Sequence, residues 1–425
     1  MVRSRPVFYN PPCPLADPLR CARFYPGART PLMEHTKKNV ALLAGCQAML
    51  FTNNVTLVSF AALAGYSLAD NKMLSTLPAT AYVVGAALAT LPASFFMKRF
   101  GRQTGFQVGT ATGIVGAAVC CLGLWLHSFW LLCAGVLVLG VYNAFGQYYR
   151  FAAADAASHE FKAKAISLVL TGGLLGGIIG PELSKHTRDM FAVPFLGGYA
   201  SLIVFCLITM ALLAFLRIPQ PSVAERHEPV RPLAQIMAQP AFIVAVTGSA
   251  LGYGVMNLLM TATPLAMGLY GHPYSSAALV IQWHVIGMFA PSFVTGSLIK
   301  RFGLLNVMLV GAGMQFACLV IALSGTAVAN FWFALLLLGV GWNFLYIGGT
   351  TLLTEAYKPS EKAKAQGAND LAIFLLMAAS SSASGILLHR NGWETLNYLA
   401  APFVIAVAVA LQWLAARRRR GMRTA

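Results

Sequence analysis

Charged side chains are scarce in this sequence of 425 residues. Asp, Glu, Lys and Arg make up 10% of it, against roughly 25% in an ordinary soluble domain, while 58% of the residues are hydrophobic. A chain of this composition has too little polar surface to keep a folded domain in water. The composition therefore excludes a soluble globular protein, and the lipid bilayer is the expected solvent.

Acidic residues are the scarcest charged group, with 13 Asp and Glu against 30 Lys and Arg. Asp155, Glu182, Glu355 and Asp370 all fall near the ends of apolar stretches, so we expect no carboxylate at the membrane centre. The sequence also lacks a nucleophile–base pair and a phosphate-binding loop, so we expect no enzyme. The eight cysteines have no spacing typical of a metal site or a disulfide framework, and we expect Cys13 and Cys21 to be free thiols in a reducing compartment.

The first 32 residues lack the apolar core of a cleavable signal peptide and contain several prolines and scattered charges. We predict a disordered cytoplasmic tail over residues 1–38. Met33, directly before the first apolar stretch, is a plausible alternative start of translation.

Long apolar runs dominate the rest of the chain, and most reach the ~20 residues that a helix needs to cross the hydrocarbon core. We predict an all-α membrane protein with 12 transmembrane helices. The first six are Asn39–Ser67, Met73–Met97, Gly105–Leu126, Phe129–Tyr149, Ala165–Glu182 and Phe191–Phe215. The other six are Ala241–Tyr270, Ser276–Ile299, Leu304–Leu323, Phe331–Leu353, Leu371–Leu388 and Thr395–Leu414.

The net charge of +17 follows the membrane topology. Sorted by the predicted sides, 26 of the Lys and Arg residues fall on the side of the two termini and four fall on the other. The positive-inside rule predicts that both termini lie in the cytoplasm. We also expect the protein to sit in the cell inner membrane. The basic side chains also attract anionic membrane lipid, so a nucleic-acid partner is not required.

The sequence repeats itself at an offset of about 200 residues. "KRFG" occurs at 98–101 and 300–303, "KAKA" at 162–165 and 362–365, and "LGVYNAF" (139–145) is echoed by "LGVGWNF" (338–344). At the offset of 200 that the "KAKA" copies have, Asn143 corresponds to Asn343. The echoes predict two six-helix bundles, over residues 39–216 and 241–415. A cytoplasmic linker (217–240) joins them, and a basic cytoplasmic tail (416–425) follows.

This duplicated pattern resembles the major facilitator superfamily, whose basic loop motif has the form Gly-x-Leu-x-Asp-Arg-x-Gly-Arg. Gly296, Leu298, Arg301 and Gly303 match it in the second copy, and Arg99, Gly101 and Arg102 match it in the first. Both copies have Lys (Lys98, Lys300) where the family usually has Asp. We interpret both as cytoplasmic turns, in which glycine permits a tight bend.

The resemblance implies transport by alternating access, with the substrate held near the midplane between the two bundles. It also implies a cavity lined by the first, fourth, seventh and tenth helices. Those helices carry nine candidate cavity residues: Gln47, Asn53, Asn54, Asn143, Gln147, Asn257, Trp342, Asn343 and Tyr346. Hydrogen bonds that only join one helix to another are an alternative explanation for these side chains.

One histidine, His284, lies deep in an apolar stretch, with Met288 one helical turn further on. Met256 and Met260 have the same spacing in the preceding helix, and counting from the turn at residue 272 places the two pairs at matched depths. Thioether and imidazole ligands suit Cu(I), and Cys46 and Met49 offer further soft donors. Methionine is also a common packing residue, so both readings stay open.

The Met-x-x-x-Met and His-x-x-x-Met pair, together with "QYYRFAAADAA" (147–157), resembles the CcoA-like copper importers of the same superfamily. That resemblance implies Met256, Met260, His284 and Met288 as ligands of a transported Cu(I), no prosthetic group, and a cytoplasmic copper-accepting protein as partner. We therefore predict copper import for cytochrome oxidase assembly.

Two alternatives remain. A carrier of riboflavin or another planar solute would use aromatic walls, for which Tyr142, Tyr148, Tyr253, Trp342 and Tyr346 are available. A proton-coupled drug exporter is suggested by Gly176, Gly180 and Pro181, although glycines at this spacing also let helices pack closely.

Overall fold

A computed structural model describes residues 31–71, 74, 77–158, 160–218 and 230–423. Over these ranges the chain is helical and forms no strand, so the prediction of an all-α fold is confirmed. Residues 1–30 of the predicted tail, with Cys13 and Cys21, and residues 219–229 of the predicted linker lie outside the described residues.

The first bundle is built by hydrophobic helices that pack along one another, α2 on α8 and α9, and α5 on α3 and α4. Small residues permit this approach: a side chain at Gly140 would meet the backbone of α3 at 2.2 Å. The helices are α2 (Pro31–Leu68), α3 (Leu77–Phe100), α4 (Arg102–Trp125), α5 (Phe129–Gly146), α6 (Tyr149–Asp155), α7 (Lys162–Leu170), α8 (Gly172–Thr187) and α9 (Leu196–Ala214).

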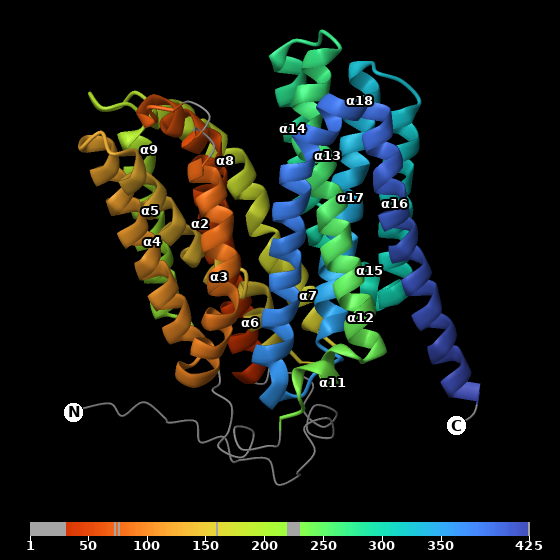
Figure 1. Cartoon of the computed structure of the whole chain (residues 1–425). Helices are drawn as coiled ribbons and strands as arrows, with labels where there is room; N and C mark the ends of the chain where they lie inside the picture. Colours follow the sequence, from red (N-terminus) through yellow and green to blue (C-terminus); the bar gives the residue numbers. More distant parts are fainter. Residues whose placement is uncertain (1–30, 72–73, 75–76, 159, 219–229, 424–425) are drawn as a thin grey trace, which may run out of the picture.

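The second bundle follows the short helix α11 (Leu233–Met237) and packs α17 against α14 and α16, and α13 against α18. Its helices are α12 (Pro240–Val246), the π-helix η2 (Thr247–Leu251), α13 (Gly252–Leu269), α14 (Tyr274–Phe289), α15 (Ser292–Phe302), α16 (Leu304–Leu323), α17 (Val328–Leu353), the 3₁₀ turn η3 (Pro359–Glu361) and α18 (Lys362–Arg423). The helices of the two bundles come together at the end near α6, α7 and α11 and diverge toward the other end (Figure 1).

By length and composition, ten helices of the described chain are apolar enough to cross a membrane, or eleven when the bent pair α14 and α15 counts as one span. Helix α18 counts once, although its backbone leaves helical geometry at Gly392 (φ 78°, ψ 174°) and its ribbon reverses direction along its length (Figure 1). The sequence predicts twelve spans, one more than eleven, because it treats the segments before and after Gly392 as two separate spans.

Three predicted boundaries differ from the structure. Helix α2 begins at Pro31, inside the predicted disordered tail, because proline is favoured at the first helical position. Helix α18 runs through the predicted basic tail to Arg423, because arginine is a good helix former. The predicted eighth span bends by 43° between Phe289 and Ser292, because Pro291 lacks the N–H that would continue the α14 ladder.

The repeated basic tetrapeptides end α3 and α15 at the same end of the molecule, which we call the basic end. Gly101 and Gly303 are the single residues that separate α3 from α4 and α15 from α16, and both have φ of 90°. Side chains rarely adopt this region, where ψ is 161° and 148°, so glycine is required by the backbone itself.

We expect Gly101→Ala and Gly303→Ala each to destabilise the protein by about 1–3 kcal/mol, the typical cost of a residue forced into this region. The measurement is the thermal midpoint of the purified protein in detergent. Gly313→Ala is the matched control, since a Cβ there meets nothing within 4 Å and a helical Gly→Ala change is favourable. Equal midpoints for all three variants would contradict the strained-turn interpretation.

Candidate functional site

A chain of polar side chains joins the two bundles. Tyr346 of α17 donates its hydroxyl to Gln147 Oε1 at 3.2 Å, and Gln147 Nε2 donates to Asn143 Oδ1 at 3.1 Å. Asn54 of α2 donates to the same oxygen at 3.1 Å and accepts from the hydroxyl of Tyr82 in α3. Four helix segments therefore share one hydrogen-bonded network, which we call the polar chain. Four of its five members were predicted as cavity residues or aromatic wall, and Tyr82 was not.

Aromatic rings pack directly beside the polar chain. Trp342 and Tyr346, one turn apart on α17, are stacked with centroids 4.8 Å apart and an interplanar angle of 16°. Tyr253 of α13 meets them edge-on at 5.3 and 5.6 Å, and Phe289 lies 5.7 Å from Trp342. The buried Trp342 Nε1 has no hydrogen-bond partner among the described residues. This aromatic cluster thus presents a π surface and one unused donor.

A buried ion pair, which the sequence analysis missed, ties the bundles together beside this cluster. Arg150 of α6 contacts Asp370 of α18, and both side chains are 2% exposed. Arg150 also donates to Thr350 Oγ1 at 3.2 Å and lies over the ring of Tyr346 at 4.6 Å. An offset of 200 relates Arg150 to its hydrogen-bond partner Thr350, but the repeat does not relate Arg150 to Asp370. The prediction that Asp370 lies only near a helix end did not anticipate this burial.

The first copy of the basic motif bridges the bundles at the basic end. Lys98 Nζ donates to the carbonyl of Ser360 at 2.8 Å. Arg102 pairs with Asp155 at 3.1 Å and donates to Gln366 Oε1 at 2.6 Å. The motif retains a charge contact to a neighbouring helix through Arg102, although Lys98 stands where the family usually has Asp.

The second copy of the basic motif also contains Lys and Arg, but its contacts are weaker. Lys300 pairs with Glu160 at 3.3 Å, with both side chains largely exposed. The guanidinium of Arg301 lies over the ring of Phe302 at 5.2 Å, as that of Arg99 lies over Phe100. Exposed pairs stabilise little, so of the two copies the first makes the stronger contact between the bundles.

The predicted copper ligands are buried in the second bundle. Met256 and Met288 are 1% and 5% exposed, His284 is fully buried, and Met260 is half-buried. His284 Nδ1 donates to the carbonyl of Leu335 in α17 at 2.7 Å, which leaves Nε2 as the lone-pair nitrogen, without a partner among the described residues. This imidazole nitrogen is thus available as a metal ligand.

The helices that carry these four residues do not pack mainly on each other. Helix α14 lies against α17, where a side chain at Gly339 would meet the backbone of His284 at 2.5 Å, and α13 lies against α18. The hydrogen bond to α17 directs the imidazole of His284 toward that helix. Matched depth, on which the sequence analysis relied, did not imply that α13 and α14 face each other closely.

Three predicted cavity residues hydrogen-bond within one bundle. Asn343 donates to Ser292 Oγ at 2.6 Å, beside the bend between α14 and α15. Asn257 donates to two serines of α18 at 2.9 Å each, and Asn53 donates to the sulfur of Cys206 at 3.4 Å. The structure thus favours the helix-joining alternative for these three, because their amides are used in packing.

The remaining candidates also pack within the first bundle. Cys46 is fully buried and Met49 is half-buried. Tyr142, predicted as an aromatic wall, packs on Gly113, where a Cβ would meet its ring at 2.9 Å. Gly176 and Gly180 let α8 approach α2, with a Cβ at Gly176 only 2.6 Å from the backbone of Thr52. These glycines are explained by close helix packing.

Comparison with known proteins identifies the family. The family model described as Major Facilitator Superfamily matches residues 41–345 and 278–425. The chain belongs to the Major Facilitator Superfamily. It is 41% identical over 380 residues to the riboflavin transporter RfnT of Brucella anthropi, with 88% of this chain and 95% of that protein covered. It is 30% identical to YddS of Bacillus subtilis, an uncharacterized transporter of the superfamily, with 84% and 86% covered.

Solved transporters share the fold at low sequence identity. The proton:xylose symporter XylE, bound to 6-bromo-6-deoxy-D-glucose, superposes with a TM-score of 0.75 at 13% identity, covering 89% of this chain and 95% of XylE. A bacterial homologue of the iron transporter ferroportin, in an outward-facing state, superposes with a TM-score of 0.71 at 14% identity, covering 89% and 99%. The family model and the 41% identity to a transporter identify this protein as a membrane transporter, and its candidate spans make it multi-pass.

Proposed function

We propose that this transporter carries riboflavin or a closely similar planar solute, by alternating access between the two bundles. The observation that carries the proposal is the aromatic cluster of Tyr253, Trp342 and Tyr346 beside the polar chain. The 41% identity to a riboflavin transporter supports it. Riboflavin, previously the alternative, thus replaces copper as the leading hypothesis.

The chemistry of the cluster suits a flavin. A flat ring system gains from stacking on indole and phenol faces, each such pair contributing about 0.5–1.5 kcal/mol beyond burial. The unpartnered Trp342 Nε1 offers a donor for a carbonyl or ring nitrogen. The amides of Gln147 and Asn143 offer donors and acceptors for hydroxyl groups of the side arm.

We further propose that the basic end faces the cytoplasm of a cell inner membrane, as the positive-inside rule predicts. The hydrogen bonds of Lys98 and Arg102 join the bundles at this end, and the bundles diverge toward the other (Figure 1). This arrangement corresponds to a state that opens away from the cytoplasm, the state from which an importer loads its substrate.

Copper remains the second candidate because of one observation, the buried and unpartnered Nε2 of His284. We expect cells that carry the gene to accumulate riboflavin, but not copper, above matched cells without it. We also expect a triple Met→Leu variant at 256, 260 and 288 to retain riboflavin uptake within about twofold, because Leu conserves volume at a usual cost under ~1.5 kcal/mol.

Uptake of labelled riboflavin and of copper, normalised to protein in the membrane, separates the two functions. Loss of copper accumulation in the triple variant, with copper uptake in the parent, would establish the metal site, because a hydrocarbon cannot ligate Cu(I). Absence of riboflavin uptake in cells with normal amounts of the parent protein would overturn the flavin proposal.

A further inference from the structure

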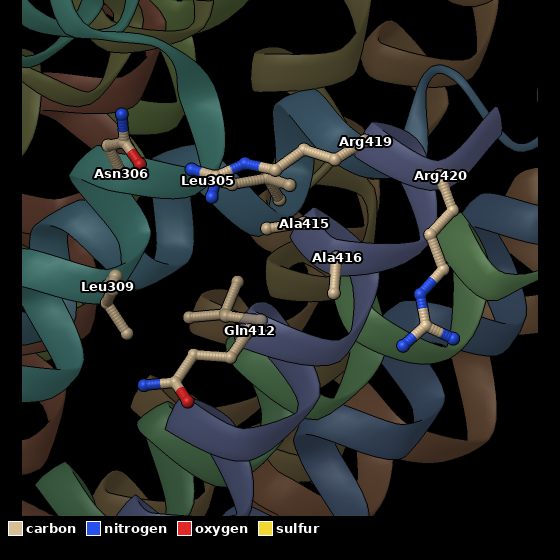
Figure 2. A pocket seen from close by; sticks show the side chains of 9 residues that line it. Leu305, Asn306, Leu309, Gln412, Ala415, Ala416, Arg419 and Arg420 are labelled. Carbon is tan, nitrogen blue, oxygen red and sulfur yellow. The ribbon is translucent and has the colours of Figure 1, made fainter. Parts of the chain in front are cut away.

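A pocket of about 450 Å³ lies at the basic end, between the start of α16 and the last turns of α18 (Figure 2), and no residue of the aromatic cluster lines it. Leu305, Leu309 and Leu411 form its apolar part, and Arg419 and Arg420 supply its charge. Two arginines of the basic run at the end of α18 therefore line a pocket.

The charge of the pocket has one sign. None of the described residues that line it is acidic. The guanidinium of Arg419 lies beside Leu305, whereas that of Arg420 points in another direction (Figure 2). Guanidinium groups pair bidentately with phosphate oxygens. The pocket therefore suits an anion that carries several acceptor oxygens.

The apolar part points to an occupant with long hydrocarbon chains. Helices α16 and α18 are both candidate membrane spans. Phe316, two turns after the lining residue Leu309 on the same helical face, is 46% exposed, and Val409, one turn before the lining residue Gln412, is 58% exposed. The apolar part is therefore continuous along both helices with the surface that faces lipid, which a free phosphate or a soluble anion would not use.

We propose that this pocket binds the headgroup of an anionic phospholipid, with its phosphate on Arg419 and its acyl chains along the groove between α16 and α18. Basic pockets between spanning helices are known to suit such headgroups. A lipid held here bridges two helices of the second bundle at the end where the bundles meet.

The test measures lipid retained by the purified full-length protein in native mass spectrometry, with phosphatidylglycerol and phosphatidylcholine offered together. We expect preferential retention of phosphatidylglycerol by the parent. Each arginine near a lipid surface changes binding by about fivefold, so Arg419→Gln should weaken it by roughly fivefold. Ala415→Trp, which fills the pocket without changing charge, should also remove the bound lipid.

Arg417→Gln is the matched control, because it removes the same charge from the same helix. Arg417 stacks over Trp413 at 5.6 Å and does not line the pocket. It should keep the preference for phosphatidylglycerol. Equal weakening by Arg417→Gln would show diffuse attraction and overturn the proposal, as would undiminished binding in the Ala415→Trp protein with an unchanged thermal midpoint. Displacement of the lipid by millimolar inorganic phosphate would assign the site to a soluble anion instead.

Discussion

Replacement of Asp370 by asparagine is expected to abolish riboflavin uptake and to reduce the amount of folded transporter in the membrane. The change leaves Arg150 buried without its counter-charge, and breaking a buried pair by removing one partner costs about 3–5 kcal/mol. That cost is a large part of the stability of a typical fold. The measurements are uptake, membrane abundance and the thermal midpoint in detergent.

An exposed ion pair provides the matched control for this experiment. Glu182 pairs with Lys185 at 2.7 Å, with both side chains more than half exposed, so Glu182→Gln should cost at most about 1 kcal/mol. The double variant Arg150→Gln with Asp370→Asn removes both buried charges and should recover abundance more than uptake. Wild-type abundance and uptake in the Asp370→Asn protein would show that the pair has no role.

Replacement of Trp342 by leucine is expected to raise the apparent KM for riboflavin by roughly tenfold or more while the protein stays in the membrane. Leucine keeps the site apolar but removes the face that stacks on Tyr346 and the unpartnered indole N–H. A lost aromatic pair accounts for about 0.5–1.5 kcal/mol, and a lost hydrogen bond to substrate adds about 0.5–1.5 kcal/mol. Concentration-dependent uptake of labelled riboflavin measures the change.

A second tryptophan allows a like-for-like comparison. Trp283 packs on Trp332 at 5.4 Å and is 39% exposed, outside the aromatic cluster. Trp283→Leu should leave the KM unchanged within about twofold, and Trp342→Phe should fall between the parent and Trp342→Leu because it keeps a ring but loses the donor. Equal KM values for the parent and the Trp342→Leu protein would place the substrate elsewhere and leave the copper hypothesis to be tested first.

Local sequence determined the parts of this protein that depend on solvent and on backbone conformation. Apolar length specified spanning helices because each backbone group in lipid must be satisfied within its own segment. Gly101 and Gly303 could be placed in turns because they separate apolar runs at equivalent points of a repeat, and both have positive φ. The three amide members of the polar chain, Asn54, Asn143 and Gln147, followed from the cost of leaving an amide in lipid, whereas Tyr82 did not.

Tertiary structure decided which of the predicted side chains meet. Asn143 and Asn343 occupy equivalent positions in the repeat, yet Asn143 belongs to the network between bundles and Asn343 holds α17 to α15. His284 and the methionines share a depth, yet α14 packs on α17 and α13 on α18. Arg150 and Asp370 are 220 residues apart and their pairing has no local signal. Helical periodicity fixes the height and face of a side chain within its own helix. The rotation of that face toward a neighbour is set by the packing of all the helices together.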